Sequence, residues 1–184
     1  MQKEFSRNKP ETGKGLTIVI TGDGKGKTTA ALGMALRSAG HGMKSLMIQF
    51  IKDQEAGEHL AIKFLSPYLE IIRCGRGFVR KEKGDLKIHK EAAVRGLNLA
   101  QEKMESGNYD LIILDEIFPA LTLGLISLEE ILSLIARKPE RTHLILTGRG
   151  APKEVIDLAD TVSEIREIKH AFRKGIPAKK GIEF

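Results

Sequence analysis

The chain has 184 residues, 41% of them hydrophobic and 29% charged, with a formal net charge of +6, values of an ordinary soluble globular protein. The single cysteine, Cys74, excludes an internal disulfide, and no apolar run approaches the ~18 residues of a membrane span. The N-terminus also lacks an apolar signal core, so we expect a cytoplasmic protein without a membrane partner. A basic chain suits polyanionic ligands such as phosphates or nucleic acid, although many basic proteins bind neither.

Residues 1–15 are polar and mixed in charge, and we expect a mobile arm or a segment that orders only against a ligand or partner. Residues 16–184 contain no repeat, linker or low-complexity tract. This length is sufficient for one domain with a substantial core.

A glycine-rich turn joins an apolar run, 16–20, to an amphipathic segment that begins near Gly26. Strand, turn and helix in succession predict a nucleoside triphosphate site, because the turn amides and the helix dipole converge on an anion. Lys27 is expected to reach the terminal phosphates, and the Thr28 hydroxyl a bound Mg²⁺. The candidate nucleotide-binding residues are Thr21, Gly22, Asp23, Gly24, Lys25, Gly26, Lys27, Thr28 and Thr29.

The turn departs from the usual phosphate-loop pattern, in which four residues separate the first glycine from Gly-Lys-Ser/Thr. Only three residues separate Gly22 from Gly26, and Thr21 stands where the first glycine is expected. The loop is therefore one residue short, or it uses threonine in place of glycine. An accidental glycine cluster does not explain the flanking strand and helix.

The next segments predict a glycine-stopped helix end at 39–42, a buried strand at 44–51, a short helix at 55–65 and a strand at 69–73. Lys52 and Asp53 follow the second strand at a carboxyl end, where open α/β sheets bind ligands, but a solvated loop is the favoured interpretation for both. The segment 74–81 is rich in glycine and basic residues and carries Phe78. From the residues alone, we expect Phe78 to pack against the protein body rather than to contact a flat ligand.

Residues 85–106 repeat apolar side chains at three- and four-residue steps, which predicts a long helix on the sheet. Its expected core positions are Leu86, Ala93, Leu97, Ala100 and Met104. The run 109–116 then places four apolar residues directly before Asp115 and Glu116. In phosphate-loop enzymes an acid at this position orders the Mg²⁺, directly or through water, so both residues are candidate metal ligands with Thr28.

A capping box, Ser127 with Glu130, opens a further helix, and residues 143–147 predict another strand. Arg149 follows that strand, and a phosphate contact and a plain surface position are equally favoured for it. We expect a short helix at 152–160 with Pro152 in its first turn, and an edge strand at 162–168. Residues 169–184 show no clear periodicity.

Strands that alternate with helices, with a phosphate loop first, predict an α/β fold. We expect one P-loop NTPase-like (RecA-like) domain with a mainly parallel sheet and helices on both faces.

With these pieces placed, the chain resembles the corrinoid adenosyltransferases of the cobalamin-synthesis (CobA/CobO/BtuR) type from residue 17 to the end. The short phosphate loop is itself a mark of that family. The motifs that carry the resemblance are Gly22–Thr29, Gln49–Lys52, Gly75–Phe78, Leu114–Glu116, Thr147–Gly150, Asp157–Glu164, Lys169–Phe172 and Gly181–Phe184.

The resemblance implies transfer of the 5′-deoxyadenosyl group of ATP to the Co(I) centre of a reduced corrinoid, with release of triphosphate. Lys27, Lys25 and the loop amides would neutralise the triphosphate, with Mg²⁺ held by Thr28 and Glu116. Phe78 matches the aromatic segment that helps hold the corrinoid without its lower axial ligand, and Arg80 stands where relatives often have a second aromatic.

The family also implies ATP bound in a reversed sense along the loop, so that its ribose carbon faces the corrinoid. The partners implied are ATP, the corrinoid, an electron donor such as a reduced flavoprotein, and a second subunit in a homodimer. No nucleic acid is expected.

Three alternatives remain open. A nucleic-acid-dependent ATPase suits the basic charge, but with two Tyr, seven Phe and no Trp the chain has few residues for base stacking. A small-molecule kinase should show an arginine-rich lid, which the sequence lacks. A non-catalytic nucleotide-binding module would not need Lys27, Thr28 and Glu116.

Overall fold

The computed structural model describes residues 13–77 and 83–184, with the side chains of 83–85 left aside. Six strands form one sheet in the order β3-β2-β4-β5-β1-β6, and its five neighbouring pairs are parallel. The strands are β1 Thr17–Thr21, β2 Ser45–Gln49, β3 Leu69–Arg73, β4 Leu111–Asp115, β5 His143–Thr147 and β6 Thr161–Glu164. The predicted α/β class and parallel sheet are confirmed.

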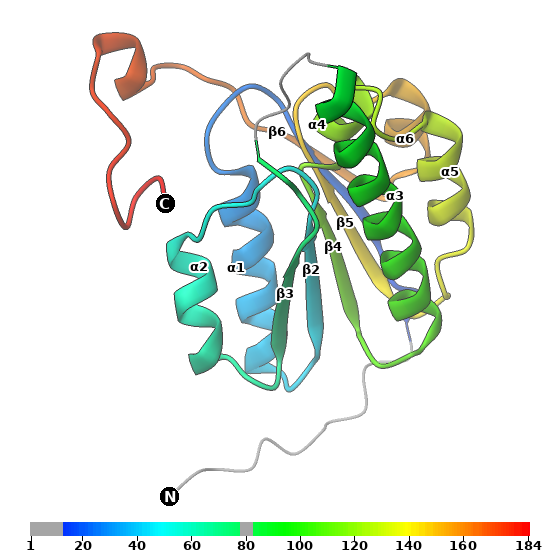
Figure 1. Ribbon diagram of the computed structural model, residues 1–184. Coiled ribbons are helices and arrows are strands. Elements are labelled where there is room, and N and C mark those ends of the chain that lie inside the picture. The colour runs from blue at the N-terminus through cyan, green and yellow to red at the C-terminus, as the bar shows by residue number, and fades with distance from the viewer. Residues whose placement is uncertain (1–12, 78–82) are drawn as a thin grey trace, which may run out of the picture.

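Helices cover both faces of the sheet, as predicted (Figure 1). Helices α1 and α2 lie on one face, and α3 to α6 lie on the other. The helices are α1 Lys27–Gly40, α2 Gly57–Ala61, α3 Lys83–Glu105, α4 Ile117–Thr122, α5 Leu128–Ala136 and α6 Lys153–Leu158. Two 3₁₀ turns, η1 Ile62–Phe64 and η2 Ala171–Lys174, complete the described elements.

Alternation along the strands divides the core into two clusters. In β4, Ile112 and Leu114 face the α3–α6 side, whereas Leu111 and Ile113 pack with Ala31 and Ala35 of α1. The five residues of β4 and of β2 are buried throughout, as central strands covered on both faces must be. Because both strands are held between two layers of helices, the polar side chains at their carboxyl ends occupy defined positions.

The boundaries of several elements differ from the sequence-based predictions. The segment 55–65 forms only one turn of α-helix before η1, and Pro152 caps α6 from outside with an extended ψ of 148°. The predicted core position Leu86 is wrong, because this side chain is 43% exposed. It lies in the first turn of α3, which stands beyond the carboxyl ends of the strands in Figure 1.

The edge strand predicted at 162–168 is shorter than expected. β6 pairs with β1 at the sheet edge but ends at Glu164. The Ile165 carbonyl then accepts a 2.7 Å hydrogen bond from the Gly24 amide in the loop that follows β1. After β6 the chain therefore no longer pairs with β1 but contacts the glycine-rich loop that follows β1.

None of the helices in the described part of the chain has the length and apolar content to cross a membrane.

Candidate active site

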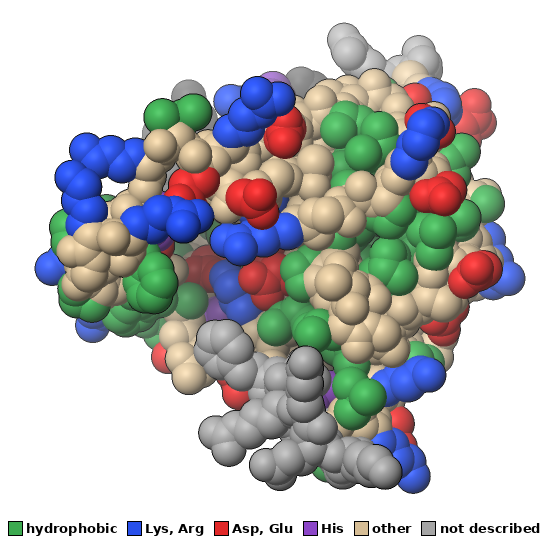
Figure 2. Space-filling view, turned by 90° about the horizontal axis from the view of Figure 1, so that it is seen from above, with side chains coloured by type: hydrophobic (Ala, Val, Ile, Leu, Met, Phe, Trp, Pro, Cys, Tyr) green, Lys and Arg blue, Asp and Glu red, His purple; other side chains and the backbone are tan. Residues whose placement is uncertain are grey.

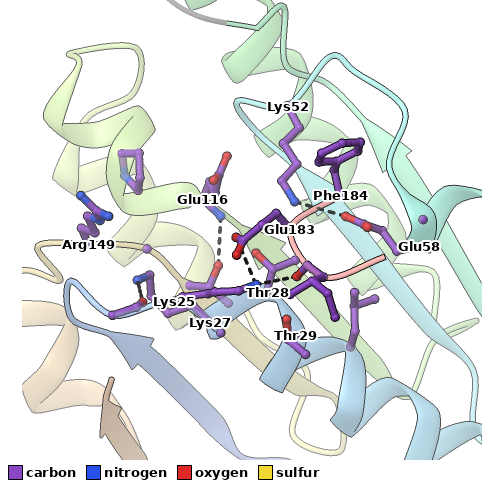
Figure 3. Close-up of a pocket in the computed structure, with 18 of the residues that line it drawn as sticks. Lys25, Lys27, Thr28, Thr29, Lys52, Glu58, Glu116, Arg149, Glu183 and Phe184 are labelled. Atoms are coloured by element: carbon purple, nitrogen blue, oxygen red, sulfur yellow. Dashed lines mark hydrogen bonds and ion pairs between the residues drawn. The ribbon is translucent and has the colours of Figure 1, made fainter. Parts of the chain in front are cut away.

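A cavity of about 500 Å³ opens at the carboxyl ends of the strands. Figure 2 looks down on this end of the molecule, where acidic and basic side chains surround a hollow. Figure 3 shows the side chains that point into it from several elements. The described lining residues are Gly24 to Thr29, Leu32, Lys52, Gly57, Glu58, Glu116, Pro119, Thr147 to Arg149, and Gly181 to Phe184.

The phosphate loop packs against the chain that follows β6. Gly22 has a φ of +96°, and a Cβ there would lie 2.4 Å from the Ile165 carbonyl oxygen, so only glycine fits. Thr21 ends β1 opposite Glu164 and accepts a hydrogen bond from the Ala151 amide on its hydroxyl. Of the predicted nucleotide-binding residues in the loop, Gly24 to Thr29 line the cavity, whereas Thr21, Gly22 and Asp23 are not among its lining residues.

The loop delivers the first turn of α1 to the cavity. Gly26 precedes the helix with a φ of +117°, which lets the chain turn from loop to helix in one residue. The first amides of a helix have no intrahelical acceptor, and no acidic side chain occupies the first turn of α1. This end of α1 therefore presents N–H groups and a positive dipole to an anion in the cavity.

Lys27 folds back over the loop. Its ammonium donates hydrogen bonds to the carbonyl oxygens of Gly22, at 2.6 Å, and Gly24, at 2.7 Å. Burial lowers the pKa of Lys27, and the positive charge of Arg149 lowers it further. An anion that entered the cavity would stabilise the charged form of Lys27 and offset part of the cost of burying it, so the site favours negatively charged ligands.

Asp115 lies at the end of β4 and is fully buried. One of its oxygens accepts hydrogen bonds from the hydroxyls of Thr28, at 2.9 Å, and Thr147, at 2.7 Å. The other accepts one from the amide nitrogen of Gln49 at 3.1 Å. Side chains from α1, β2 and β5 thus converge on one carboxylate of β4, which explains why a buried charge is tolerated there.

Glu116, unlike Asp115 beside it, lines the cavity. It is the only non-glycine residue with positive φ in the described chain, at +60°, and its amide donates to the Thr147 hydroxyl at 3.0 Å. Burial raises the pKa of Glu116, and the charge of Asp115 raises it further against the opposing effect of Lys52. The side chain is therefore a carboxylate whose charge a nearby cation would stabilise.

Arg149 lines the same cavity from the loop after β5. Its guanidinium lies 3.9 Å from the Asp23 carboxylate, and both side chains are largely exposed. An exposed pair at this distance contributes little to stability, so the guanidinium is available to a ligand.

Sequence profiles place the chain in a known family. The profile of the ATP:corrinoid adenosyltransferase BtuR/CobO/CobP family matches residues 13–184. The chain belongs to this family. Members of the ATP:corrinoid adenosyltransferase family transfer an adenosyl group from ATP to a corrinoid, and the predicted resemblance and enzyme class are confirmed.

Individual relatives support the same assignment. The chain is 40% identical over 174 residues to a corrinoid adenosyltransferase of Sinorhizobium sp, which covers 93% of the chain and 81% of the relative. It is 37% identical over 172 residues to one of Pseudomonas aeruginosa, with 93% and 84% covered. The nucleic-acid-dependent ATPase is not favoured by these relationships.

The structure of the flagellar accessory protein FlaH from Methanocaldococcus jannaschii is similar in fold alone. The TM-score is 0.58 at 13% sequence identity, over 83% of this chain and 71% of that one. The adenosyltransferase chain thus has the P-loop NTPase-like fold that the sequence predicted.

Two parts of the adenosyltransferase cavity escaped the sequence analysis. Lys52 was expected in a solvated loop, but it lines the cavity and pairs with Glu58 of α2 at 3.2 Å. The signal for a ligand-facing position was its place at the carboxyl end of the buried strand β2, which the sequence alone did not make stronger than a solvated loop. The solvated-loop expectation holds for Asp53, which is exposed.

The segment 181–184 is the second part. The Lys25 ammonium donates to the Ile182 carbonyl at 2.6 Å and pairs with Glu183 at 3.2 Å, which brings the segment over the phosphate loop (Figure 3). Its lack of periodicity hid this role, because the contacts depend on the fold and not on a repeating pattern. Phe78, by contrast, lies outside the described residues.

Proposed function

We propose that this chain catalyses attack of Co(I) in a reduced corrinoid on the 5′ carbon of ATP. The cobalt supplies the electron pair of the new Co–C bond, the C5′–O bond breaks, and its electron pair leaves with triphosphate. The supporting observation is the composition of the cavity. Its described lining combines Lys25, Lys27, Arg149 and the first turn of α1 but contains no His or Cys.

That composition suits a reaction whose nucleophile arrives with the substrate. The protein then has two tasks, which are to align the 5′ carbon with cobalt and to stabilise the leaving triphosphate. Lys25 and Lys27 are proposed to take phosphate oxygens in place of the carbonyl and carboxylate oxygens they now contact. Bound ATP runs in the reversed sense, with its ribose carbon toward the corrinoid.

The residues present fit a Mg²⁺ ion beside the triphosphate. The Thr28 hydroxyl donates a hydrogen bond to Asp115, which leaves the lone pairs of its oxygen for a cation, and Glu116 offers a carboxylate in the same cavity. In the described part of the chain no three His, Cys, Asp or Glu side chains cluster as a metal site. Mg²⁺ would accordingly take its other ligands from water and phosphate, as it commonly does, and neutralise triphosphate charge when bound.

The remaining assignments rest on the family resemblance. Phe78 is proposed to contact the corrinoid and to favour loss of its lower axial ligand, which eases reduction of Co(II) to Co(I) by a donor such as a reduced flavoprotein. The protein is proposed to act in the cytoplasm as a homodimer without nucleic acid. Most of the N-terminal arm expected at residues 1–15 lies outside the described residues, whereas Gly15 is buried and its amide donates to the Glu140 carbonyl at 2.6 Å.

The activity is tested by mixing the protein with ATP, Mg²⁺ and chemically reduced cobalamin. The expected product has the light-sensitive absorption spectrum of an alkylcobalamin. Orthophosphate release that DNA or RNA stimulates, with no change in the cobalamin spectrum, would contradict the proposal.

A further inference from the structure

A chain of side-chain hydrogen bonds connects helix α2 to the phosphate loop. The His59 Nε2 atom lies 2.7 Å from the Gln49 Oε1 atom, and Gln49 Nε2 donates to Asp115 Oδ2 at 3.1 Å. Asp115 Oδ1 in turn accepts a hydrogen bond from the Thr28 hydroxyl. A helix on the rim of the cavity is thereby coupled to the hydroxyl nearest the proposed metal position.

The His59 ring orients the Gln49 amide, and the Asp115 carboxylate, which can only accept, fixes the direction of the bond from Thr28. The Ala56 amide donates to His59 Nδ1 at 2.8 Å, so that nitrogen carries no proton and the neutral ring carries its proton on Nε2. Nε2 therefore donates to Gln49 Oε1. The Gln49 amide can then present only its NH₂ group to Asp115.

Burial makes the alternative orientation costly. Gln49 and Asp115 are both fully buried, so no solvent replaces a lost partner. If the Gln49 amide turned over, its oxygen would face the Asp115 carboxylate and its NH₂ group would face the His59 donor, which leaves two mismatched contacts. Burial also lowers the pKa of His59, in agreement with a neutral ring.

We propose that His59 is a positioning residue for Mg²⁺–ATP. It holds Gln49 and, through Asp115, keeps the Thr28 proton directed away from the cavity and the Thr28 lone pairs directed into it. The inference rests on the proposed use of Thr28 as a Mg²⁺ ligand. It assigns to α2 a function that the phosphate loop itself does not reveal.

Two substitutions separate the two contacts of the ring. In His59→Asn, the amide oxygen can replace Nδ1 as acceptor for Ala56, but the contact with Gln49 is lost. In His59→Gln, the longer amide can replace Nε2 as donor to Gln49, but the acceptor for Ala56 is lost. His41→Asn, at an exposed histidine after α1, serves as the matched control.

Binding of ATP is measured directly by calorimetry for each variant, with and without Mg²⁺, alongside a thermal melt. For His59→Asn we expect Mg²⁺-dependent ATP binding to weaken about tenfold or more, since partners behind metal ligands have effects of this order. Binding without Mg²⁺ should stay within about twofold of the parent chain, and His59→Gln should recover most of the Mg²⁺ effect.

The inference is overturned if His59→Asn keeps the Mg²⁺ dependence of the parent chain. It is also overturned if both variants lose ATP binding in proportion to lost thermal stability, as a purely structural residue would. Because no corrinoid enters this assay, a parent chain that binds Mg²⁺–ATP but transfers no adenosyl group would refute the proposed function and leave this test intact.

Discussion

The cavity has two walls of different construction. The inner wall comprises Thr28 and Thr147, which line the cavity, and Asp115, which is buried behind them and joins them through buried or half-buried hydrogen bonds. The outer wall comprises two ion pairs, Lys25–Glu183 and Lys52–Glu58, whose side chains are 17–38% exposed. Bonds in the inner wall are shielded from water, whereas exposed pairs of the second kind contribute at most about 1 kcal/mol.

This contrast indicates which contacts a substrate meets unchanged and which it must displace. The inner wall is preorganised, because every donor around Asp115 already has its acceptor. The outer wall holds Lys25 and Lys52 with carboxylates that a triphosphate can replace at small cost.

Asp115→Ala should have the largest effect. It leaves the donors of Thr28, Thr147 and Gln49 without a partner in a buried site, so we expect a loss of about 3 kcal/mol or more in the free energy of unfolding. Urea unfolding measures this loss. Asp23→Ala, at an exposed carboxylate, is the control, and equal stability of the two variants would show that the inner wall is not preorganised by its hydrogen bonds.

Lys27→Ala should abolish most ATP binding while the fold persists. A lysine contact with a charged phosphate contributes about 2 kcal/mol, so the Kd for ATP should rise about 30-fold or more. Lys153→Ala, at an exposed lysine in α6, is the control.

Phe78→Ala should keep the ATP affinity of the parent chain and slow only the reduction of Co(II) to Co(I). A loss of ATP affinity equal to that of Lys27→Ala would contradict the roles assigned to the two residues.

Glu183→Gln should slightly strengthen ATP binding, in contrast to Lys27→Ala. Without the carboxylate, Lys25 has no charged competitor for the phosphate, so the Kd for ATP should fall by up to about threefold at low salt. Calorimetry at two salt concentrations measures the change. A tenfold weakening of ATP binding would instead make Glu183 part of the binding site and would remove the distinction between the walls.

Substitution of His143, which lies far from both walls, should have the smallest effect, and this effect is on stability. Burial lowers its pKa, and the charge of Lys138 lowers it further, while its Nδ1 atom accepts a hydrogen bond from the Leu16 amide. A lowered folded-state pKa means that this stability is complete above the unfolded value of 6.5 and is lost as pH falls below it. His143→Asn keeps an acceptor for Leu16 but does not titrate.

Urea unfolding at about pH 7.5 and pH 5.5 compares this variant with the parent chain. The parent should lose more stability than His143→Asn on acidification. An identical loss in both proteins would show that His143 does not contribute to the acid sensitivity.

The inner wall was largely predictable from the sequence, whereas the outer wall was not. Strands 69–73 and 143–147 were predicted with their observed bounds, and so was the capping box of Ser127 and Glu130, because local patterns determine them. The positions of Asp115 and Thr28 follow from buried strands and a phosphate loop. Their direct hydrogen bond follows only from the strand order that places β5 between β4 and β1.

The outer wall depends on contacts between distant parts of the chain. Glu183 lies 158 residues from Lys25, and nothing periodic in 169–184 indicates that it returns to the loop. The α2 helix has no buried residue that would have marked its position. The short phosphate loop was recognised as unusual, but the close packing of Gly22 on Ile165 follows only from the position of β6.

In the proposed reaction the phosphate loop holds triphosphate as the leaving group, and Co(I) attacks the 5′ carbon of ATP. The most direct measurement is phosphorus NMR of the products of a single turnover with excess protein, reduced cobalamin and one equivalent of ATP. We predict one inorganic triphosphate for each light-sensitive Co–C bond formed. Formation of ADP and orthophosphate, without a Co–C bond, would place the attack at phosphorus and contradict the account.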